Sequence, residues 1–278
     1  MTRFWSRWRP QRNDRNQESP LRHHRRDLAR ETQNLTPNII VQTEASDESI
    51  LYQHLLAPIQ PNLTTSSSSP RITVQNADSF TAAQRILNAH PTAKVGVLNM
   101  ASEKHPGGGW LHGALAQEEA LCFRSTLAAT LNDSHYPLPE FGAIWSPRVA
   151  VFRDEVARWC RIYPHDDIFI VGVVSLAALR NPRLSKDKQQ FANLGDIRVT
   201  KDKMRQVLRV LAQNNVTHCV LGALGCGAFH NPPREVARIS GEVLSESEWR
   251  GKFEEIVFAV LDTRNEGNFR IFNEALGA

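Results

Sequence analysis

The chain has 278 residues, of which 41% are hydrophobic and 22% charged, and its net charge is +4 at neutral pH. This length and apolar content are typical of one large folded domain with an extension. No apolar stretch approaches the roughly 20 residues needed to cross a bilayer, which argues against a membrane-spanning helix.

The cysteines give no sign of a disulfide framework or a zinc knuckle. None of the 4 cysteines has C-x-x-C spacing, and the first residues do not resemble a secretory leader. We therefore expect an intracellular protein of the nucleus or the cytoplasm.

The basic charge is concentrated at the amino terminus. Residues 1–30 contain nine arginines and three acidic residues, so with a total of +4 the rest of the chain carries a net −2. A nucleic-acid-binding domain carries its basic surface on the folded body, so direct nucleic-acid binding is expected at most of the tail. We predict that residues 1–20 form a disordered basic leader. A mitochondrial import signal and an electrostatic tether to polyanions are the alternatives.

Two further segments follow the leader. Residues 21–69 are predicted to form an accessory helical region, with helical spacing over 22–33, and a linker rich in Ser and Pro. Residues 70–278 are predicted to form the main domain, in which short apolar runs alternate with helical patterns. The predicted strands are 72–75, 95–100, 149–152, 168–174, 217–221 and 256–261, and the predicted helices include 81–89, 119–131 and 202–214. Such alternation predicts an α/β layered fold.

A glycine loop with nearby acids follows the predicted strand at 95–100. A glycine triplet is followed by a glutamine and two glutamates at the start of a predicted helix: Gly107, Gly108, Gly109, Gln117, Glu118 and Glu119. Glycines let backbone N–H groups approach an oxygen-rich ligand, and an acid at the helix start can act on that ligand. Open α/β sheets bind ligands beyond the carboxyl ends of their strands, so this loop is placed to bind one. The combination of glycines with adjacent acids makes it a candidate for glycosidic-bond chemistry. The ordinary alternative is that the two glutamates only complement the helix dipole.

A second glycine loop follows the strand predicted at 217–221. Its residues are Gly225, Cys226, Gly227, Ala228 and Phe229. Alternating glycines expose successive N–H groups as an anion nest, and a helix predicted to begin near Pro233 adds its positive end. A diphosphate suits this arrangement. A Rossmann dinucleotide site is not favoured, because its third glycine and its acidic residue are missing.

Together these stretches resemble the signature of poly(ADP-ribose) glycohydrolases, and the fuller pattern is similar to the compact microbial branch of that family. The resemblance rests on the two loops and on residues 97–102, 146–149, 151–153 and 224–229. It implies a macrodomain-like three-layer α-β-α fold with a central mixed sheet and an N-terminal helical extension. It also implies hydrolysis of ribose–ribose O-glycosidic bonds from the chain terminus.

The family resemblance implies a role for each candidate residue. Glu119 is the general acid/base, Glu118 orients ribose hydroxyls, and Asn99 contacts the distal ribose. Gly107, Gly108 and Gly109 supply N–H groups, and Gln117 supports their loop. Gly225, Gly227 and Ala228 hold the diphosphate, with Cys226 as a small filler between them. Phe229 packs against the terminal ribose.

The implied partners are poly(ADP-ribose), ADP-ribosylated proteins and ADP-ribose as the product, without a metal or a cofactor, and we expect a monomer. Two other functions stay open: a non-catalytic ADP-ribose reader, and a hydrolase of mono-ADP-ribosylated protein or nucleic acid. The paired acids favour an enzyme, because a reader does not need them.

Overall fold

The structure is a computed structural model that describes residues 20–60, 69–263 and 265–277. Nearly all of the predicted basic leader and most of the predicted linker lie outside the described residues. Within the described ranges, no helix is long and apolar enough to cross a membrane.

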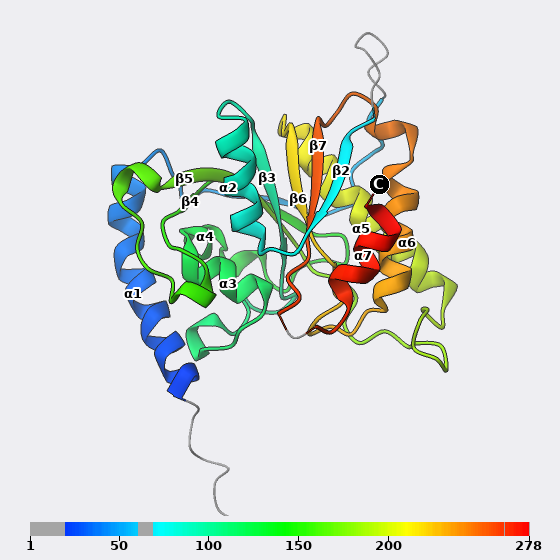
Figure 1. Cartoon of the computed structure of the whole chain (residues 1–278), viewed down its shortest axis with the longest axis horizontal. Helices are drawn as coiled ribbons and strands as arrows, with labels where there is room; N and C mark the ends of the chain where they lie inside the picture. The colour runs from blue at the N-terminus through cyan, green and yellow to red at the C-terminus, as the bar shows by residue number, and fades with distance from the viewer. Residues whose placement is uncertain (1–19, 61–68, 264, 278) are drawn as a thin grey trace, which may run out of the picture.

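In the described part of the chain, the strands form a single mixed sheet (Figure 1). From one edge to the other, they are β1 (Ile50–Tyr52), β4 (Ala143–Val151), β5 (Phe169–Leu176), β3 (Val95–Met100), β6 (His218–Leu221), β7 (Glu255–Ala259) and β2 (Arg71–Gln75). The strands from β5 to β2 run parallel, whereas β4 is antiparallel to both of its neighbours. The carboxyl ends of the parallel strands therefore lie together at one end of the sheet, the lower end in Figure 1.

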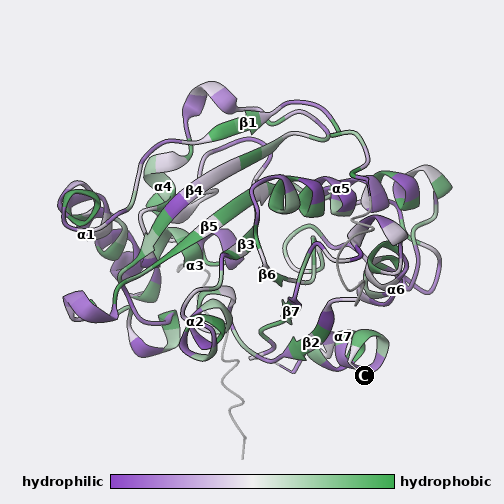
Figure 2. Cartoon of the chain, turned by 90° about the horizontal axis from the view of Figure 1, so that it is seen from above, coloured by the Kyte–Doolittle hydropathy of each residue, from purple (hydrophilic) through white to green (hydrophobic). Residues whose placement is uncertain are grey.

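Helices cover both faces of this sheet (Figure 2). One face carries α2 (Ser79–Ala89), α3 (Gln117–Arg124) and α4 (Leu127–Thr130), with α1 (Pro20–Gln42) packed beside α3. The other face carries α5 (Leu194–Gln213), α6 (Pro233–Leu244) and α7 (Asn268–Leu276). Short 3-10 turns lie at Trp110–His112, Asp133–His135, Val156–Arg158, His165–Asp167 and Ser247–Trp249.

Alternation along each central strand supplies two hydrophobic cores. Val97, Val220 and Val257 belong to the core under α2 and α3. The residues that follow or precede them, such as Leu98 and Ile256, belong to the core under α5 and α6. Because both faces are covered, the central strands are apolar at nearly every position, and this explains why the sequence pattern shows them clearly.

The predicted three-layer α-β-α fold with a central mixed sheet is confirmed. The prediction of one helix over 119–131 is wrong, because extended backbone at Ser125 separates α3 from α4. The Ser125 hydroxyl donates to the carbonyl of Leu121 at 2.8 Å, and its backbone pairs with Val151. The start of β4 is also corrected from residue 149 to Ala143.

Helix α3 is anchored at both ends. At its carboxyl end, buried Arg124 pairs with the carboxylate of Asp78. The same carboxylate caps α2 by accepting two backbone N–H groups of its first turn, at 3.1 Å each. At the amino end of α3, the amide Nε2 of Gln117 donates to the hydroxyl of Ser79 at 3.0 Å. Helix α2 therefore helps to position both ends of α3.

The Asp78→Ala variant tests this anchor. It removes a helix cap and leaves the Arg124 guanidinium buried without its carboxylate, so we expect the free energy of unfolding to fall by about 3 to 5 kcal/mol. Urea unfolding measures this change. As a matched control, Asp27→Ala removes a surface ion pair with Arg30 of 3.5 Å, and it should cost less than about 1 kcal/mol. Equal losses in the two variants would contradict the anchor.

Candidate active site

A cleft of about 970 Å³ opens where the central parallel strands end. Its walls come from several parts of the chain: α1, the loop between β3 and α3, the first turn of α3, α4 with the residues that follow it, the segment after β5 and the loop after β6. The lining includes Gln33, Thr36, Pro37, Met100, Ser102, Gly108, Gly109, Gln117, Glu118, Glu119, Arg180, Gly225, Gly227, Ala228 and Phe229.

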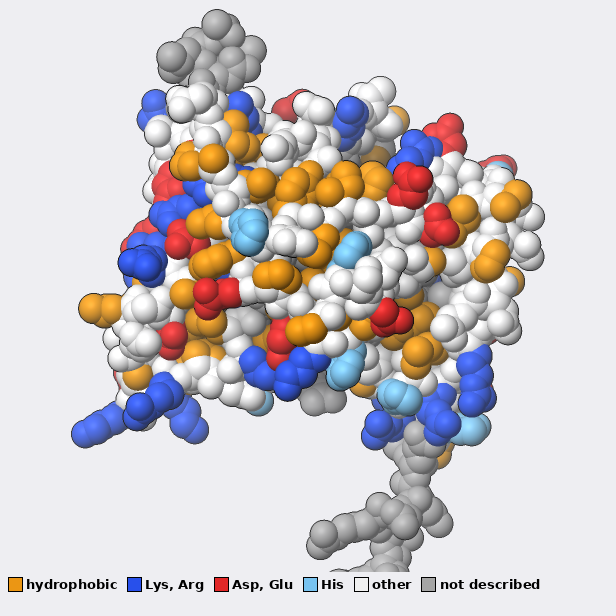
Figure 3. Space-filling model, turned by 180° about the vertical axis from the view of Figure 1, so that it is seen from behind, with side chains coloured by type: hydrophobic (Ala, Val, Ile, Leu, Met, Phe, Trp, Pro, Cys, Tyr) orange, Lys and Arg blue, Asp and Glu red, His pale blue; other side chains and the backbone are white. Residues whose placement is uncertain are grey.

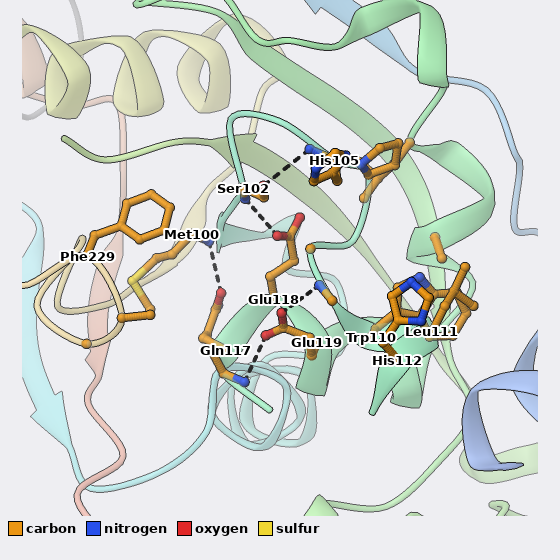
Figure 4. Close-up of a pocket in the computed structure, with 18 of the residues that line it drawn as sticks. Met100, Ser102, His105, Trp110, Leu111, His112, Gln117, Glu118, Glu119 and Phe229 are labelled. Atoms are coloured by element: carbon orange, nitrogen blue, oxygen red, sulfur yellow. Dashed lines mark hydrogen bonds between the residues drawn. The ribbon is translucent and has the colours of Figure 1, made fainter. Parts of the chain in front are cut away.

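The first turn of α3 points three successive side chains in different directions, because residues on a helix are roughly 100° apart around its axis. Gln117 faces β3, where its Oε1 accepts the N–H of Met100 at 2.9 Å (Figure 4). Its Nε2 donates to the carbonyl of Leu98 at 2.7 Å. This side chain therefore fastens the helix start to the carboxyl end of β3.

Glu118 points to the base of the cleft and is only 4% exposed. Its Oε2 accepts the N–H of Ser102 at 2.7 Å, and its Oε1 lies 3.3 Å from the Nδ2 of Asn99. Asn99 is completely buried behind Glu118, where it also donates to the hydroxyl of Ser175 at 3.0 Å. In this arrangement Asn99 contacts Glu118 and does not line the cleft.

Burial raises the pKa of Glu118 to about 8, although hydrogen bonds from Ser102 and Asn99 oppose the shift. At neutral pH this carboxyl is therefore mostly protonated. The Oδ1 of Asn99 is buried and has no hydrogen-bond partner among the described residues. Because the two ends of an amide have nearly the same shape, the reversed orientation of Asn99 offers an acceptor for the Glu118 proton.

Glu119 turns back toward the glycine loop instead. Its Oε1 accepts the N–H of Gly109 at 2.9 Å, and its Oε2 accepts the N–H of Ala116 at 2.8 Å. The second bond is the helix-side half of a capping box, so a local rule of helix initiation directs this carboxylate into the wall of the cleft. The two adjacent glutamates thus have different partners: Glu118 binds groups in the interior, and Glu119 binds the glycine loop.

The first glycine loop passes directly over both carboxylates. A Cβ on Gly108 would lie 2.6 Å from the Oε1 of Glu119 and 3.0 Å from the Oε2 of Glu118, and the φ of this residue is +60°. Gly107 packs below against the ring of Trp110, where a Cβ would come within 2.7 Å. Only glycine fits these positions, and it leaves the carboxylates reachable from the cleft.

In the second glycine loop, only one of the two glycines is required by the protein itself. Gly225 has a φ of +74°, and its Cβ would lie 2.5 Å from the Nδ2 of Asn231, which donates to backbone carbonyls around the loop. Gly227 is exposed, and a Cβ added there would meet no described atom within 4 Å, so the open space beside it belongs to the cleft. Cys226 turns away from the cleft, with its Sγ 3.8 Å from the carbonyl of Leu224.

Phe229 packs against an arginine that is itself held by an ion pair, and the sequence pattern predicts neither contact. The guanidinium of Arg180 lies 4.0 Å from the centre of the Phe229 ring. Arg180 also binds both carboxylate oxygens of Glu103, at 2.6 and 2.7 Å. This clasp of Glu103, Arg180 and Phe229 joins the segments that follow β3, β5 and β6, and it fixes the aromatic ring in the wall of the cleft.

Helix α1 braces the opposite side of the cleft. The Nε of Arg25 donates to the carbonyl of Gly113 at 2.8 Å, and the Nε of Arg22 donates to that of His112 at 2.9 Å. Basic side chains gather at the amino-terminal end of α1 (Figure 3), where the sequence contains Arg22, Arg25, Arg26 and Arg30. The accessory region thus contributes both a wall and a support of the site.

The structure brings most of the candidate residues to one cleft. Glu118, Glu119, Gln117, Gly108, Gly109 and the residues of the second loop other than Cys226 line it, whereas Asn99, Gly107 and Cys226 lie behind its surface. Sequence reasoning missed Ser102, Glu103 and Arg180. The position of Ser102 two residues beyond β3 was the available signal for that residue, whereas nothing in the sequence indicated the interaction of Arg180 with Glu103 and Phe229.

The pH dependence of stability should report the buried Glu118 carboxyl. Because its pKa rises from 4.5 to about 8 on folding, the folded protein takes up a proton between these values. This contribution is fully present below pH 4.5 and is lost as the pH rises through 8. We expect Glu118→Gln, which imitates the protonated acid, to remove this loss from unfolding free energies measured across the interval. The exposed control Glu48→Gln should keep it, and identical profiles for all three proteins would refute the assignment.

The chain was compared with known proteins. It matches the family model described as "Microbial-type PARG, catalytic domain" over residues 13–154, just over half of its length. No curated protein matches the chain.

Solved structures of poly(ADP-ribose) glycohydrolase (PARG) match nearly the whole chain. The enzyme from Thermomonospora curvata is 27% identical and has a TM-score of 0.74, and the match covers 91% of this chain and 100% of that one. Its complex with the inhibitor ADP-HPD gives 27% identity, a TM-score of 0.75, and coverages of 91% and 99%. The enzyme from Deinococcus radiodurans in complex with ADP-ribose is 26% identical and has a TM-score of 0.64, and the match covers 93% of this chain and 98% of that one. The family match and the cleft geometry lead to one conclusion: this chain belongs to the microbial-type poly(ADP-ribose) glycohydrolase family.

Proposed function

We propose that this protein hydrolyses the ribose–ribose O-glycosidic bonds of poly(ADP-ribose) and releases ADP-ribose, with Glu119 as the general acid/base. The observation that supports this most directly is the position of the Glu119 carboxylate in the cleft wall, held by two backbone N–H groups beneath a loop without side chains. A carboxylate that is both fixed and reachable suits proton transfer to a bound sugar.

The rest of the cleft suits ADP-ribose. Its volume of about 970 Å³ is at the upper end of the range for small-molecule sites. The N–H groups of the second loop form an anion nest for the diphosphate, and the open position at Gly227 admits a ligand close to the backbone. A protonated Glu118 removes one negative charge from a site that receives an anionic ligand.

In the reaction, the carboxyl of Glu119 gives its proton to the leaving ribose oxygen while the bond from the anomeric carbon to that oxygen breaks. A water then adds to the oxocarbenium-like carbon and loses a proton to the Glu119 carboxylate, which restores the acid. Glu118 orients the ribose hydroxyls. The Phe229 ring, fixed by Arg180, packs on the terminal ribose and leaves one face of the sugar open to water.

Cleavage at the chain terminus belongs to the same proposal, and the similarity to compact family members supports it. A non-catalytic reader and a hydrolase of single ADP-ribose units are the competing functions. The two acids under the glycine loop favour hydrolysis over simple binding, since binding alone does not require an acid in the cleft wall.

The Glu119→Ala variant tests the assignment. Loss of a general acid/base should lower the rate of ADP-ribose release from poly(ADP-ribose) by at least roughly 100-fold, whereas the affinity for ADP-ribose should stay within a few-fold. Product release followed by chromatography and ADP-ribose binding by calorimetry measure the two effects. The surface control Glu48→Ala should match the parent. Binding without turnover in the parent protein would favour a reader, and full activity in Glu119→Ala would exclude the proposed role.

The two glycines of the second loop provide a matched pair of variants. Gly227→Ala should leave the unfolding free energy within about 0.5 kcal/mol, because no protein atom opposes the methyl group, yet it should weaken ADP-ribose binding by about tenfold or more. Gly225→Ala should instead destabilise the fold by about 1 to 3 kcal/mol, because of its positive φ and its contact with Asn231. Unchanged ADP-ribose affinity in Gly227→Ala would show that the ligand does not approach this loop.

A further inference from the structure

Three side chains of types that can bind a metal ion converge at the end of the sheet opposite the cleft, where the parallel strands begin. His218 begins β6 and Glu255 begins β7, and the two residues are directly paired in the parallel register. His90 follows α2 as its C-cap residue, and the carboxyl end of this helix reaches the same upper end of the sheet in Figure 1. One ligand atom from each of the three residues lies within 4.8 Å of the other two.

The sheet geometry explains this convergence. His218 and Glu255 have the same orientation as Val220 and Val257, which face α2, because side chains alternate along each strand. The His90 ring lies over this pair, with its centre 5.0 Å from the centre of the His218 ring. The three residues therefore belong to three different elements and meet at one point.

We propose that His90, His218 and Glu255 bind one zinc ion, with water in the fourth position. Two imidazoles and one carboxylate form a donor set that zinc commonly uses. Tetrahedral bonds of about 2.0 to 2.1 Å place the donors roughly 3.4 Å apart, so the present spread of 4.8 Å must contract. His90 is exposed and can make this movement, whereas His218 and Glu255 are buried and already fixed.

Neighbouring residues prepare two of the ligands. The Nδ1 of His218 lies 2.9 Å from the hydroxyl of Thr217, which also accepts the N–H of Lys94 at 3.1 Å. This contact orients the ring and leaves its Nε2 without a hydrogen bond among the described residues, as is usual for a coordinating histidine. Glu255 has one oxygen bound to Arg71 at 2.7 Å, and its other oxygen is available to the ion.

The ion would join the end of α2 to the starts of β6 and β7. Its place at the amino ends of the strands separates it from the cleft at their carboxyl ends, so the inferred role is stabilisation of the domain and not a step of the reaction. Arg71 competes for the same carboxylate, and its own cationic charge opposes the ion. Removal of this arginine side chain should therefore strengthen zinc binding.

The test is a titration of the full chain, freed of any affinity tag and treated with chelator, with Zn²⁺ by calorimetry and with Co²⁺ by visible absorption. We expect one saturable site, a tetrahedral cobalt spectrum without thiolate bands, and a zinc-dependent rise in Tm. His90→Ala should weaken zinc binding by about tenfold or more and abolish the rise in Tm. The exposed control His54→Ala should change neither, and both variants should keep glycohydrolase activity.

Arg71→Met provides an independent measurement that leaves all three ligands in place. Tighter zinc binding in this variant would support Glu255 as a ligand, and unchanged affinity would remove it from the set. Absence of saturable binding, equal binding in His90→Ala and the parent, or a cobalt–thiolate band would each overturn the proposed site.

Discussion

The first turn of α3 is the part of the structure on which the site depends. Gln117, Glu118 and Glu119 each accept backbone N–H groups from different segments: the end of β3, the residue two positions beyond it, and the glycine loop. These bonds supply acceptors to backbone N–H groups at and beyond the end of β3, where strand pairing stops. They also hold a loop of irregular backbone against the start of a helix. The acid that we assign to catalysis is thus also a structural partner of its own loop.

The central strands could be predicted because burial on both faces leaves a nearly continuous apolar run, as in Val95–Met100. The start of β4 could not, because Pro147 interrupts its pattern and the strand accommodates the interruption with an irregular register between Ser146 and Val149. The three residues of β1 pair at the edge of the sheet, where a short strand has too few positions to show alternation. The break at Ser125 depends on a tertiary pairing with Val151 that local periodicity does not contain.

The candidate site was predictable to the extent that its residues lie within local motifs. Glu119 and the glycines are neighbours in sequence, and family resemblance identifies them together. The burial of Asn99 under Glu118 and the clasp of Arg180 on Phe229 join residues that are far apart in sequence, so neither follows from spacing. The contribution of α1 to the cleft is non-local in the same way, because only the fold makes Gln33 and Phe229 line the same cleft.

The two glycine loops come from opposite halves of the chain, one after β3 and one after β6, and both line the cleft. A ligand that contacts both acts as a non-covalent cross-link between these halves. Because unfolding must then release the ligand, the melting temperature of the whole domain rises with the ratio of ligand concentration to Kd. In a thermal-shift screen at a fixed ligand concentration, the size of this rise therefore ranks small molecules by their affinity for the cleft.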